Sequence, residues 1–220
     1  MVGKEPGFPW RLVTVDIDGT LTRTHGWRQI AIAFGRLDGF EATNRRFRAH
    51  EIGEDVHLTD LLDLATGRTV REVEAVLKKT PKLDGIAEGI VQLHAWGARA
   101  ALLTHNPSYV ADWYRRTFGF DDAEGVNGQA VHGGRIQPPV GIRTDKPRSL
   151  RILLSRLGVP ASQVVHVGDG WSDAEVFRLV GAGVALNSPL PDVDEAADLV
   201  LVTPDFRDVV EAISHLAPRE

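Results

Sequence analysis

The stretch LVTVDIDGTLT, residues 12–22, decides the fold. Residues 12–15 are apolar or β-branched, which is typical of a strand buried on both faces of a parallel sheet. Asp16 and Asp18 follow at once, at the carboxyl end of that strand, where open α/β sheets bind their ligands. Gly19 then permits a sharp turn away from the sheet. The stretch therefore predicts a buried strand that presents two carboxylates at the edge of a parallel sheet.

Two carboxylates so close together repel one another unless a cation or a shared proton relieves the repulsion. A site whose ligands are all oxygen atoms suits Mg²⁺. Turns rich in Asp and Gly also occur at strand ends in proteins without any such site. The interpretation therefore depends on the other segments of the chain.

A second buried strand is predicted over residues 98–103, and it ends in Thr104. Asn106 and Pro107 have the residue types favoured at the N-cap and at the first helical position, so we expect a helix from Pro107 to about Phe118. The N–H groups and the dipole at a helix start favour an anion. The Thr104 hydroxyl therefore marks a predicted phosphate site.

Lys146 and the stretch VGDGWSD, residues 167–173, complete the set of polar segments. Lys146 lies between a Gly- and Pro-rich stretch and a predicted helix at 147–157. Asp169 follows another predicted strand, and Asp173 stands about one helical turn further on. We expect both carboxylates to face the same cavity.

These four segments, in this order, resemble the motif set of the haloacid dehalogenase superfamily of phosphohydrolases. The resemblance implies that Asp16 is the nucleophile, which forms an aspartyl-phosphate. Asp18 would be the general acid and base, which protonates the leaving alcohol and then deprotonates the hydrolytic water. Thr104 and Lys146 would hold the phosphoryl oxygens. An Asp in the place of Asp18 resembles phosphatases and phosphomutases rather than dehalogenases, so mutases remain a minority alternative.

The same resemblance implies a Mg²⁺ cofactor. Asp16, the backbone carbonyl of Asp18 and Asp169 would bind the metal. Asp173 would support the metal's water shell or orient Lys146.

The resemblance also implies the fold class, an α/β Rossmann-like parallel sheet core flanked by helices, with a small helical cap inserted after the first strand. We expect the core to comprise residues 1–22 and 84–220 and the cap to comprise residues 23–83. In the cap, mixed apolar spacing predicts helices at 27–37, 41–52 and 59–66, and Thr69 with Glu72 predicts a capping box for a helix to Lys79. The remaining elements are predicted as a helix at 84–97, a hairpin or flap within 126–140 around Gly133-Gly134, strands at 181–186 and 197–202, and a helix at 206–216.

Within the superfamily the layout is most similar to the phosphoserine phosphatase group, and the match is better from about Pro81 onward than in the cap. That group usually places a Glu after the first motif to hold the substrate's ammonium, whereas this chain has His25. It also uses a cap Arg for the substrate carboxylate, near the place of Leu64 here, although Arg68 or Arg46 could substitute. A lost ammonium contact costs on the order of 1.5–3 kcal/mol. The cap therefore argues against phosphoserine specificity.

The second motif departs from the same group, which tends to have Ser and two glycines where this chain has Thr104-His105-Asn106. Thr104 keeps the hydroxyl, and His105 adds bulk beside the leaving group. We consider His25, His57 and His105 either pocket residues that contact substrate or ordinary surface and capping histidines.

Composition excludes several classes of protein. The net charge is −5, from 25 basic and 30 acidic residues without a basic run, which argues against nucleic acid as a partner. The absence of cysteine excludes disulfides and thiolate metal sites. No apolar stretch approaches the roughly 20 residues of a membrane span, and the start, MVGKEPGFPW, has no signal-peptide core. We therefore expect a cytoplasmic monomer or homodimer without a membrane partner.

The favoured function is Mg²⁺-dependent hydrolysis of a small phosphorylated metabolite, because a cap of this size can close over a small molecule but obstructs a folded protein. A phosphoserine phosphatase proper is one alternative. A phospho-accepting signalling domain and a catalytically silent phosphate-binding protein are alternatives from other classes. The Asp16/Asp18 pair and the cap argue against the signalling domain, and the presence of every candidate catalytic residue argues against the silent protein.

Overall fold

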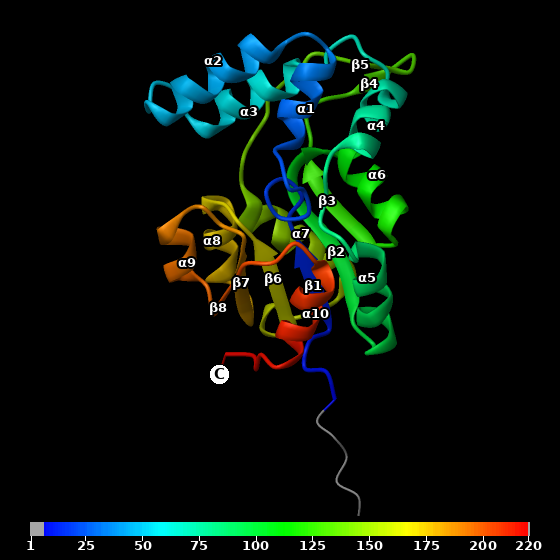
Figure 1. Cartoon of the computed structure of the whole chain (residues 1–220), viewed down its shortest axis with the longest axis vertical. Helices are drawn as coiled ribbons and strands as arrows, with labels where there is room; N and C mark the ends of the chain where they lie inside the picture. Colours follow the sequence, from blue (N-terminus) through cyan, green and yellow to red (C-terminus); the bar gives the residue numbers. More distant parts are fainter. Residues whose placement is uncertain (1–6, 220) are drawn as a thin grey trace, which may run out of the picture.

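A parallel sheet forms the core of the protein in the computed structural model, which describes residues 7–219. Its six strands lie in the order β3-β2-β1-β6-β7-β8 (Figure 1). The strands are β1 (Leu12–Val15), β2 (Arg99–Pro107), β3 (Asp122–Val126), β6 (Val164–Gly168), β7 (Ala182–Leu186) and β8 (Leu199–Leu201). The strand order reverses direction on the two sides of β1, which creates the crevice where α/β sheets bind ligands.

Helices cover both faces of the sheet, which is why β1 and β6 are buried at every residue and β2 over most of its length. Along β2, Ala100 and Leu102 pack into one core while Ala101 and Leu103 pack into the other. One face carries α5 (Ile86–Ala95), α6 (Ser108–Phe118) and α10 (Phe206–Ser214), and the other carries α7 (Lys146–Leu157), α8 (Trp171–Phe177) and α9 (Pro191–Ala196). The predicted α/β class with a Rossmann-like core is confirmed. Within residues 7–219 no helix has the length and apolar character that a membrane span requires.

Four helices lie beyond the carboxyl ends of the strands (Figure 1). They are α1 (Gly26–Ala33), α2 (Leu37–Arg48), α3 (Glu54–Asp63) and α4 (Val70–Lys79). The boundaries predicted for the first three were wrong. Gly35 and His50 adopt positive φ angles of 67° and 56° and end α1 and α2 early, while α3 begins at Glu54, five residues before the predicted start. The capping box of α4 is confirmed: Thr69 accepts the Glu72 N–H at 3.2 Å, and Glu72 accepts the Thr69 N–H at 2.8 Å.

The predicted hairpin is also confirmed, as β4 (Val131–His132) and β5 (Arg135–Ile136). Although it comes from the core segment of the chain, it pairs with the helical layer. Ile136 accepts the Gly67 N–H and donates its own N–H to Arg68, both at 2.8 Å. Gln129 donates to the Leu62 carbonyl at 2.7 Å. The division into a core of 1–22 and 84–220 and a cap of 23–83 remains a prediction. Residues 1–6 and 220 lie outside the described residues, and residues 1–6 include part of the stretch on which the signal-peptide prediction was based.

Strand β3 at the sheet edge was not predicted, because its sequence DAEGV lacks an apolar run. Tertiary contacts stabilise it instead. Arg156 of α7 pairs with Asp122 and Glu124, each at 2.9 Å, so an arginine from the neighbouring helix neutralises the polar strand.

A polar latch joins α3 to the loop before α7. The Asp55 carboxylate accepts hydrogen bonds from the Thr144 N–H and hydroxyl, both at 2.7 Å, and pairs with Arg143 at 3.1 Å. These donors hold the pKa of Asp55 below its ordinary value. The latch ties the helical layer to the segment that leads into Lys146.

We predict that Asp55→Asn lowers the free energy of unfolding by about 1 kcal/mol or less at neutral pH, since the pair is partly exposed. A lowered folded-state pKa stabilises the fold above the ordinary carboxyl pKa of about 3.9, and this stabilisation is lost as the pH falls through the folded-state pKa. Urea unfolding of wild type and variant should therefore show a difference that shrinks in acid. A difference that stays constant down to about pH 3 would contradict this account.

Candidate active site

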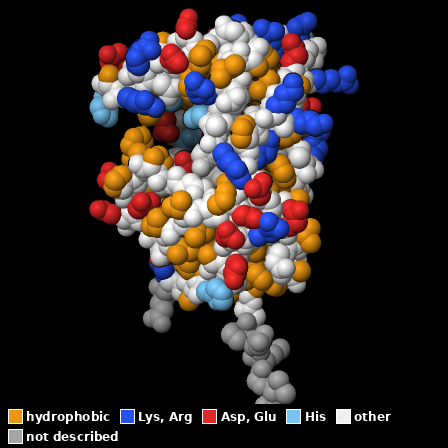
Figure 2. Space-filling view, viewed as in Figure 1, with side chains coloured by type: hydrophobic (Ala, Val, Ile, Leu, Met, Phe, Trp, Pro, Cys, Tyr) orange, Lys and Arg blue, Asp and Glu red, His pale blue; other side chains and the backbone are white. Residues whose placement is uncertain are grey.

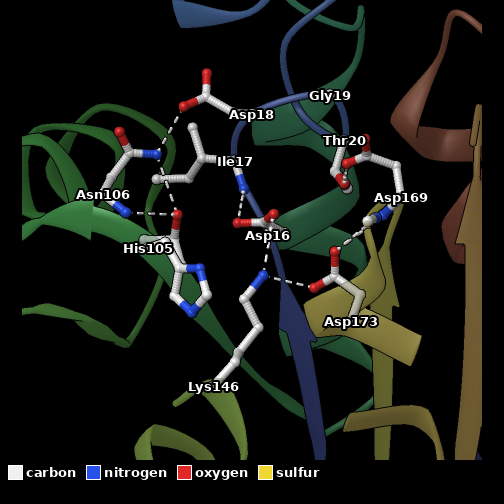
Figure 3. Close-up of polar contacts among 12 residues, drawn as sticks. Asp16, Ile17, Asp18, Gly19, Thr20, His105, Asn106, Lys146, Asp169 and Asp173 are labelled. Atoms are coloured by element: carbon white, nitrogen blue, oxygen red, sulfur yellow. Dashed lines mark hydrogen bonds and ion pairs between the residues drawn. The ribbon is translucent and has the colours of Figure 1, made fainter. Parts of the chain in front are cut away.

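The candidate site forms where β1 ends between two neighbouring strands that are paired with it in register. Val15 is paired with Leu102 on one side and with Val167 on the other, and the Asp16 N–H donates to the Val167 carbonyl at 3.0 Å. Polar side chains of these strands and of the loops after them meet at one edge of the sheet. They include Asp16 and Asp169 (Figure 3), together with Thr104 of β2.

Lys146 is 2% exposed and lies between two carboxylates. Its Nζ is 3.1 Å from Asp16 Oδ2 and 2.6 Å from Asp173 Oδ1. Burial alone would lower the pKa of Lys146, but the charges of Asp16 and Asp173 outweigh burial and raise it. Burial raises the pKa of Asp16 in turn, while the Lys146 charge opposes that shift. Lys146 therefore stays cationic and supplies a fixed positive charge beside Asp16.

Asp173 does not line the cavity, contrary to the prediction that it faces the same space as Asp169. Its Oδ1 accepts from Lys146 and from His166 Nε2 at 2.8 Å, and its Oδ2 accepts the N–H groups of Asp169 and Gly170. Burial favours the neutral acid, but Lys146 and His166 prevail and lower the pKa of Asp173. Asp173 therefore fixes Lys146 and the turn that carries Asp169.

His166 was missed by the sequence analysis, although a histidine within a buried strand is a usable signal. Its side chain is fully buried, and its Nδ1 lies 2.9 Å from the Thr14 hydroxyl. A ring protonated at Nε2 donates to Asp173 and accepts from Thr14, which satisfies both nitrogens.

Asp169 approaches the turn after β1 closely. The Thr20 hydroxyl donates to its Oδ1 at 2.6 Å, and a Cβ at position 19 would collide with its carboxylate. Gly19 also has a φ of 87°, so both the conformation and the close approach require glycine. Burial, together with the charges of Asp173 and Asp16, raises the pKa of Asp169 well above its ordinary value.

This arrangement fits a divalent cation. Carboxylate oxygens of Asp16, Asp169 and Asp173 lie within 4.8 Å of one another. Lys146 pairs with two of these carboxylates, and Asp169 has no basic partner among the described residues. An all-oxygen set with excess negative charge is what Mg²⁺ binds.

Asp18 turns away from Asp16 toward the helical layer. Its Oδ1 accepts the Gly26 N–H at 2.6 Å, and its Oδ2 accepts from Asn106 Nδ2 at 3.0 Å (Figure 3). The prediction that Asn106 caps a helix beginning at Pro107 was wrong. Strand β2 continues through an irregular register to Pro107, which is itself the N-cap of α6. The Asn106 side chain is thereby released for the site.

The site opens into a cavity of about 430 Å³ between the helical layer and the core. Figure 2 shows this hollow, with acidic and histidine side chains in its wall. All three candidate histidines line it: His25, His57 and His105. Imidazole Nε2 atoms of His57 and His105 are buried and have no hydrogen-bond partner among the described residues.

The arginine in the cavity wall is Arg48, which the sequence analysis did not select. Arg46 pairs with Asp60 at 3.3 Å, and Arg68 lies over the Phe34 ring at 4.6 Å. Neither arginine lines the cavity, so the expectation that one of them takes the place of the cap arginine was wrong. Leu64 is buried in the helical layer and lies outside the wall. Arg48 was missed because only the packing of α2 on α3 decides which arginine faces inward.

Glu54 is the carboxylate that the helical layer contributes to the wall. Its Oε1 lies 3.5 Å from His105 Nδ1, and the bond to His105 holds the pKa of Glu54 below its ordinary value. His57 stacks on Phe47, with ring centroids 4.4 Å apart, and burial lowers the pKa of His57. The outer wall thus combines one cationic side chain, one paired carboxylate and several imidazoles.

The family model of the haloacid dehalogenase-like hydrolases matches residues 10–181. The chain belongs to this family. It is 29% identical over 203 residues to a phosphoserine phosphatase of Streptomyces coelicolor. The matched region covers 91% of this chain and 49% of that protein. A phosphoserine phosphatase of Archaeoglobus fulgidus is 26% identical, with 81% of this chain and 53% of that protein covered. The chain therefore spans about half the length of these two relatives.

Solved structures agree on the fold of this haloacid dehalogenase-like hydrolase. A structure of a phosphoserine phosphatase as a phospho-aspartyl intermediate analogue superposes with a TM-score of 0.76. It is 20% identical and covers 92% of this chain and 98% of that one. At this identity the likeness establishes the fold alone.

We predict that Mg²⁺ raises the melting temperature of the wild-type protein, because a ligand that binds only the folded state stabilises it by about 2.7 kcal/mol at 100 times its Kd. Asp169→Asn should lose most of this shift, whereas Asp192→Asn, on exposed α9, should keep it. Differential scanning calorimetry with and without MgCl₂ measures both. Equal shifts in the two variants would show that the cation binds elsewhere.

Proposed function

We propose that this protein is a Mg²⁺-dependent phosphomonoester hydrolase that acts on a small phosphorylated metabolite through an aspartyl-phosphate. The observation that carries the proposal is the surrounding of Asp16. Lys146 lies 3.1 Å from its carboxylate, and Asp169 completes a metal-sized cluster, at the floor of a cavity of about 430 Å³. Phosphoryl transfer depends mainly on positioning and charge neutralisation, and this floor supplies both.

The residues divide the reaction among them. The Asp16 carboxylate attacks phosphorus and the ester oxygen leaves as an alcohol, protonated by Asp18. Asp18 then takes a proton from the water that hydrolyses the aspartyl-phosphate, which releases phosphate and restores Asp16. Lys146 and the Thr104 hydroxyl hold phosphoryl oxygens throughout. Asp16, the Asp18 carbonyl and Asp169 would hold Mg²⁺, which when bound neutralises charge on the phosphoryl group.

A second candidate is phosphoserine phosphatase proper, the activity for which the two relatives above are named. The cavity wall supports a different preference. Arg48 offers a cation for an acidic group, but Glu54 is engaged by His105 and His25 replaces the expected carboxylate. We therefore infer that the preferred substrate has an acidic group on its leaving alcohol and that binding does not require an ammonium group there.

We predict that Asp16→Asn reduces Mg²⁺-dependent phosphate release to background, because an amide oxygen is a poor nucleophile. Phosphate release from p-nitrophenyl phosphate measures this, and intact-mass spectrometry of acid-quenched wild type should show one added phosphoryl group that the variant lacks. Undiminished release by Asp16→Asn would refute the covalent mechanism.

Four esters separate the substrate candidates, because they differ only in the groups on a short leaving alcohol. Phosphoglycolate carries a carboxylate, phosphoethanolamine an ammonium, phosphoserine both, and ethyl phosphate neither. We expect kcat/KM to be highest for phosphoglycolate and lowest for phosphoethanolamine. Arg48→Met should lower the preference for phosphoglycolate over ethyl phosphate roughly 10- to 100-fold, the range of a hydrogen bond to a charged group.

Arg46→Met is the matched control, since Arg46 lies on the same helix and pairs with Asp60 outside the cavity. It should leave the preference unchanged. A kcat/KM that is highest for phosphoserine and insensitive to Arg48→Met would favour the phosphoserine phosphatase candidate instead.

A further inference from the structure

We propose that Asn106 is a positioning residue that holds the general acid Asp18 and the phosphate-binding Thr104 in register, and that the cap helix α1 holds Asn106 through Trp27. The proposal rests on the proposed function. Asn106 is 4% exposed, and its amide makes hydrogen bonds to three side chains, of which Figure 3 shows the one to Asp18. Its Nδ2 donates to Asp18 Oδ2 at 3.0 Å and to Thr104 Oγ1 at 3.1 Å, and its Oδ1 accepts from Trp27 Nε1 at 3.0 Å.

The partners fix which way the amide of Asn106 points. An indole N–H can only donate, so the oxygen of the amide must face Trp27. An ionised carboxylate can only accept, so the NH₂ group must face Asp18. Both requirements are met by one orientation, and the second hydrogen of the NH₂ group is then directed at Thr104.

That second hydrogen determines what the Thr104 hydroxyl can do. Its oxygen accepts both the Nδ2–H and the backbone N–H of Asn106, at 3.1 and 3.2 Å. Among the described residues it donates to no acceptor. With both bonds directed at the oxygen, the hydroxyl proton remains available for a phosphoryl oxygen at the cavity floor, beside Lys146.

The same residue couples the chemistry to the helical layer. Asp18 is held by Asn106 and by the N–H of Gly26, the first residue of α1, while Trp27 is the next residue of that helix. Trp27 is 2% exposed, so its ring is fixed by packing. The start of α1, Asn106, Asp18 and Thr104 thus form one hydrogen-bonded unit, and a displacement of α1 would disturb the acid and the phosphate donor together.

Leaving-group dependence tests this role. Ethyl phosphate needs a proton on its departing oxygen, whereas p-nitrophenolate leaves readily without one, so misplacing Asp18 should impair the alkyl ester more. We expect Asn106→Asp, which keeps the shape but replaces both donated bonds with a negative charge beside Asp18, to lower kcat for ethyl phosphate about 10- to 100-fold, the usual effect of losing a supporting hydrogen bond. The loss with p-nitrophenyl phosphate should be smaller. Trp27→Phe, which removes the N–H together with part of the aromatic ring, should shift the ratio of the two rates in the same direction but less.

Asn127→Ala, at an exposed position, and Trp96→Phe, remote from the cavity, are the matched controls and should leave the ratio unchanged. Asn106→Ala gives a second variant, and circular dichroism melting shows whether each protein is folded. A folded Asn106→Asp protein with the wild-type ratio would overturn the positioning role alone. Wild-type protein that releases phosphate from neither ester in the presence of Mg²⁺ would overturn the proposed function itself.

Discussion

The buried ammonium of Lys146 is the constraint on which the rest of the structure depends. A charge removed from water must be paired and hydrogen-bonded, and Lys146 meets this requirement through Asp16 and Asp173. Asp16 directly follows β1 and Asp173 lies in the first turn of α8, which follows β6, so the pairing depends on the register of those two strands. The apolar strands, the latch at Asp55 that fixes the loop before α7, and the His166 contact behind Asp173 all maintain that alignment.

Much of the fold could be predicted from the sequence because its signals are local. Apolar runs ending in Asp16 and Asp169 indicate buried parallel strands, and Thr69 with Glu72 indicates a helix start, without knowledge of any distant contact. The convergence of the polar segments followed from one topological rule, that ligands bind at the carboxyl ends of the strands. The roles assigned to these residues remain predictions, while the structure shows that Asp16, Thr104, Lys146 and Asp169 share one cavity.

What escaped prediction depends on contacts between remote segments. Asn106 is a residue type favoured at helix N-caps, but its side chain binds Asp18 and Trp27 from another part of the chain. Those hydrogen bonds take the place of the expected capping bond to the backbone of the following helix. Strand β3 is polar and is held by Arg156 from α7. The arginine of the helical layer that lines the cavity is Arg48 rather than Arg46 or Arg68. Helix packing decides which arginine faces inward, and the apolar periodicity of this segment does not predict it.

The β4–β5 hairpin has a consequence for the evolution of the cavity. It extends from the core segment, yet its backbone bonds go to Gly67 and Arg68, and Gln129 beneath it binds Leu62. The layer over the cavity is consequently assembled from two stretches of the chain. A chimaera that exchanged only residues 23–83 with a relative would keep these bonds only if the incoming backbone followed the same path beside the hairpin. Recombination that conserves these bonds must preserve the backbone path of both stretches, so the cavity wall should change here more readily by point substitution than by exchange of one stretch alone.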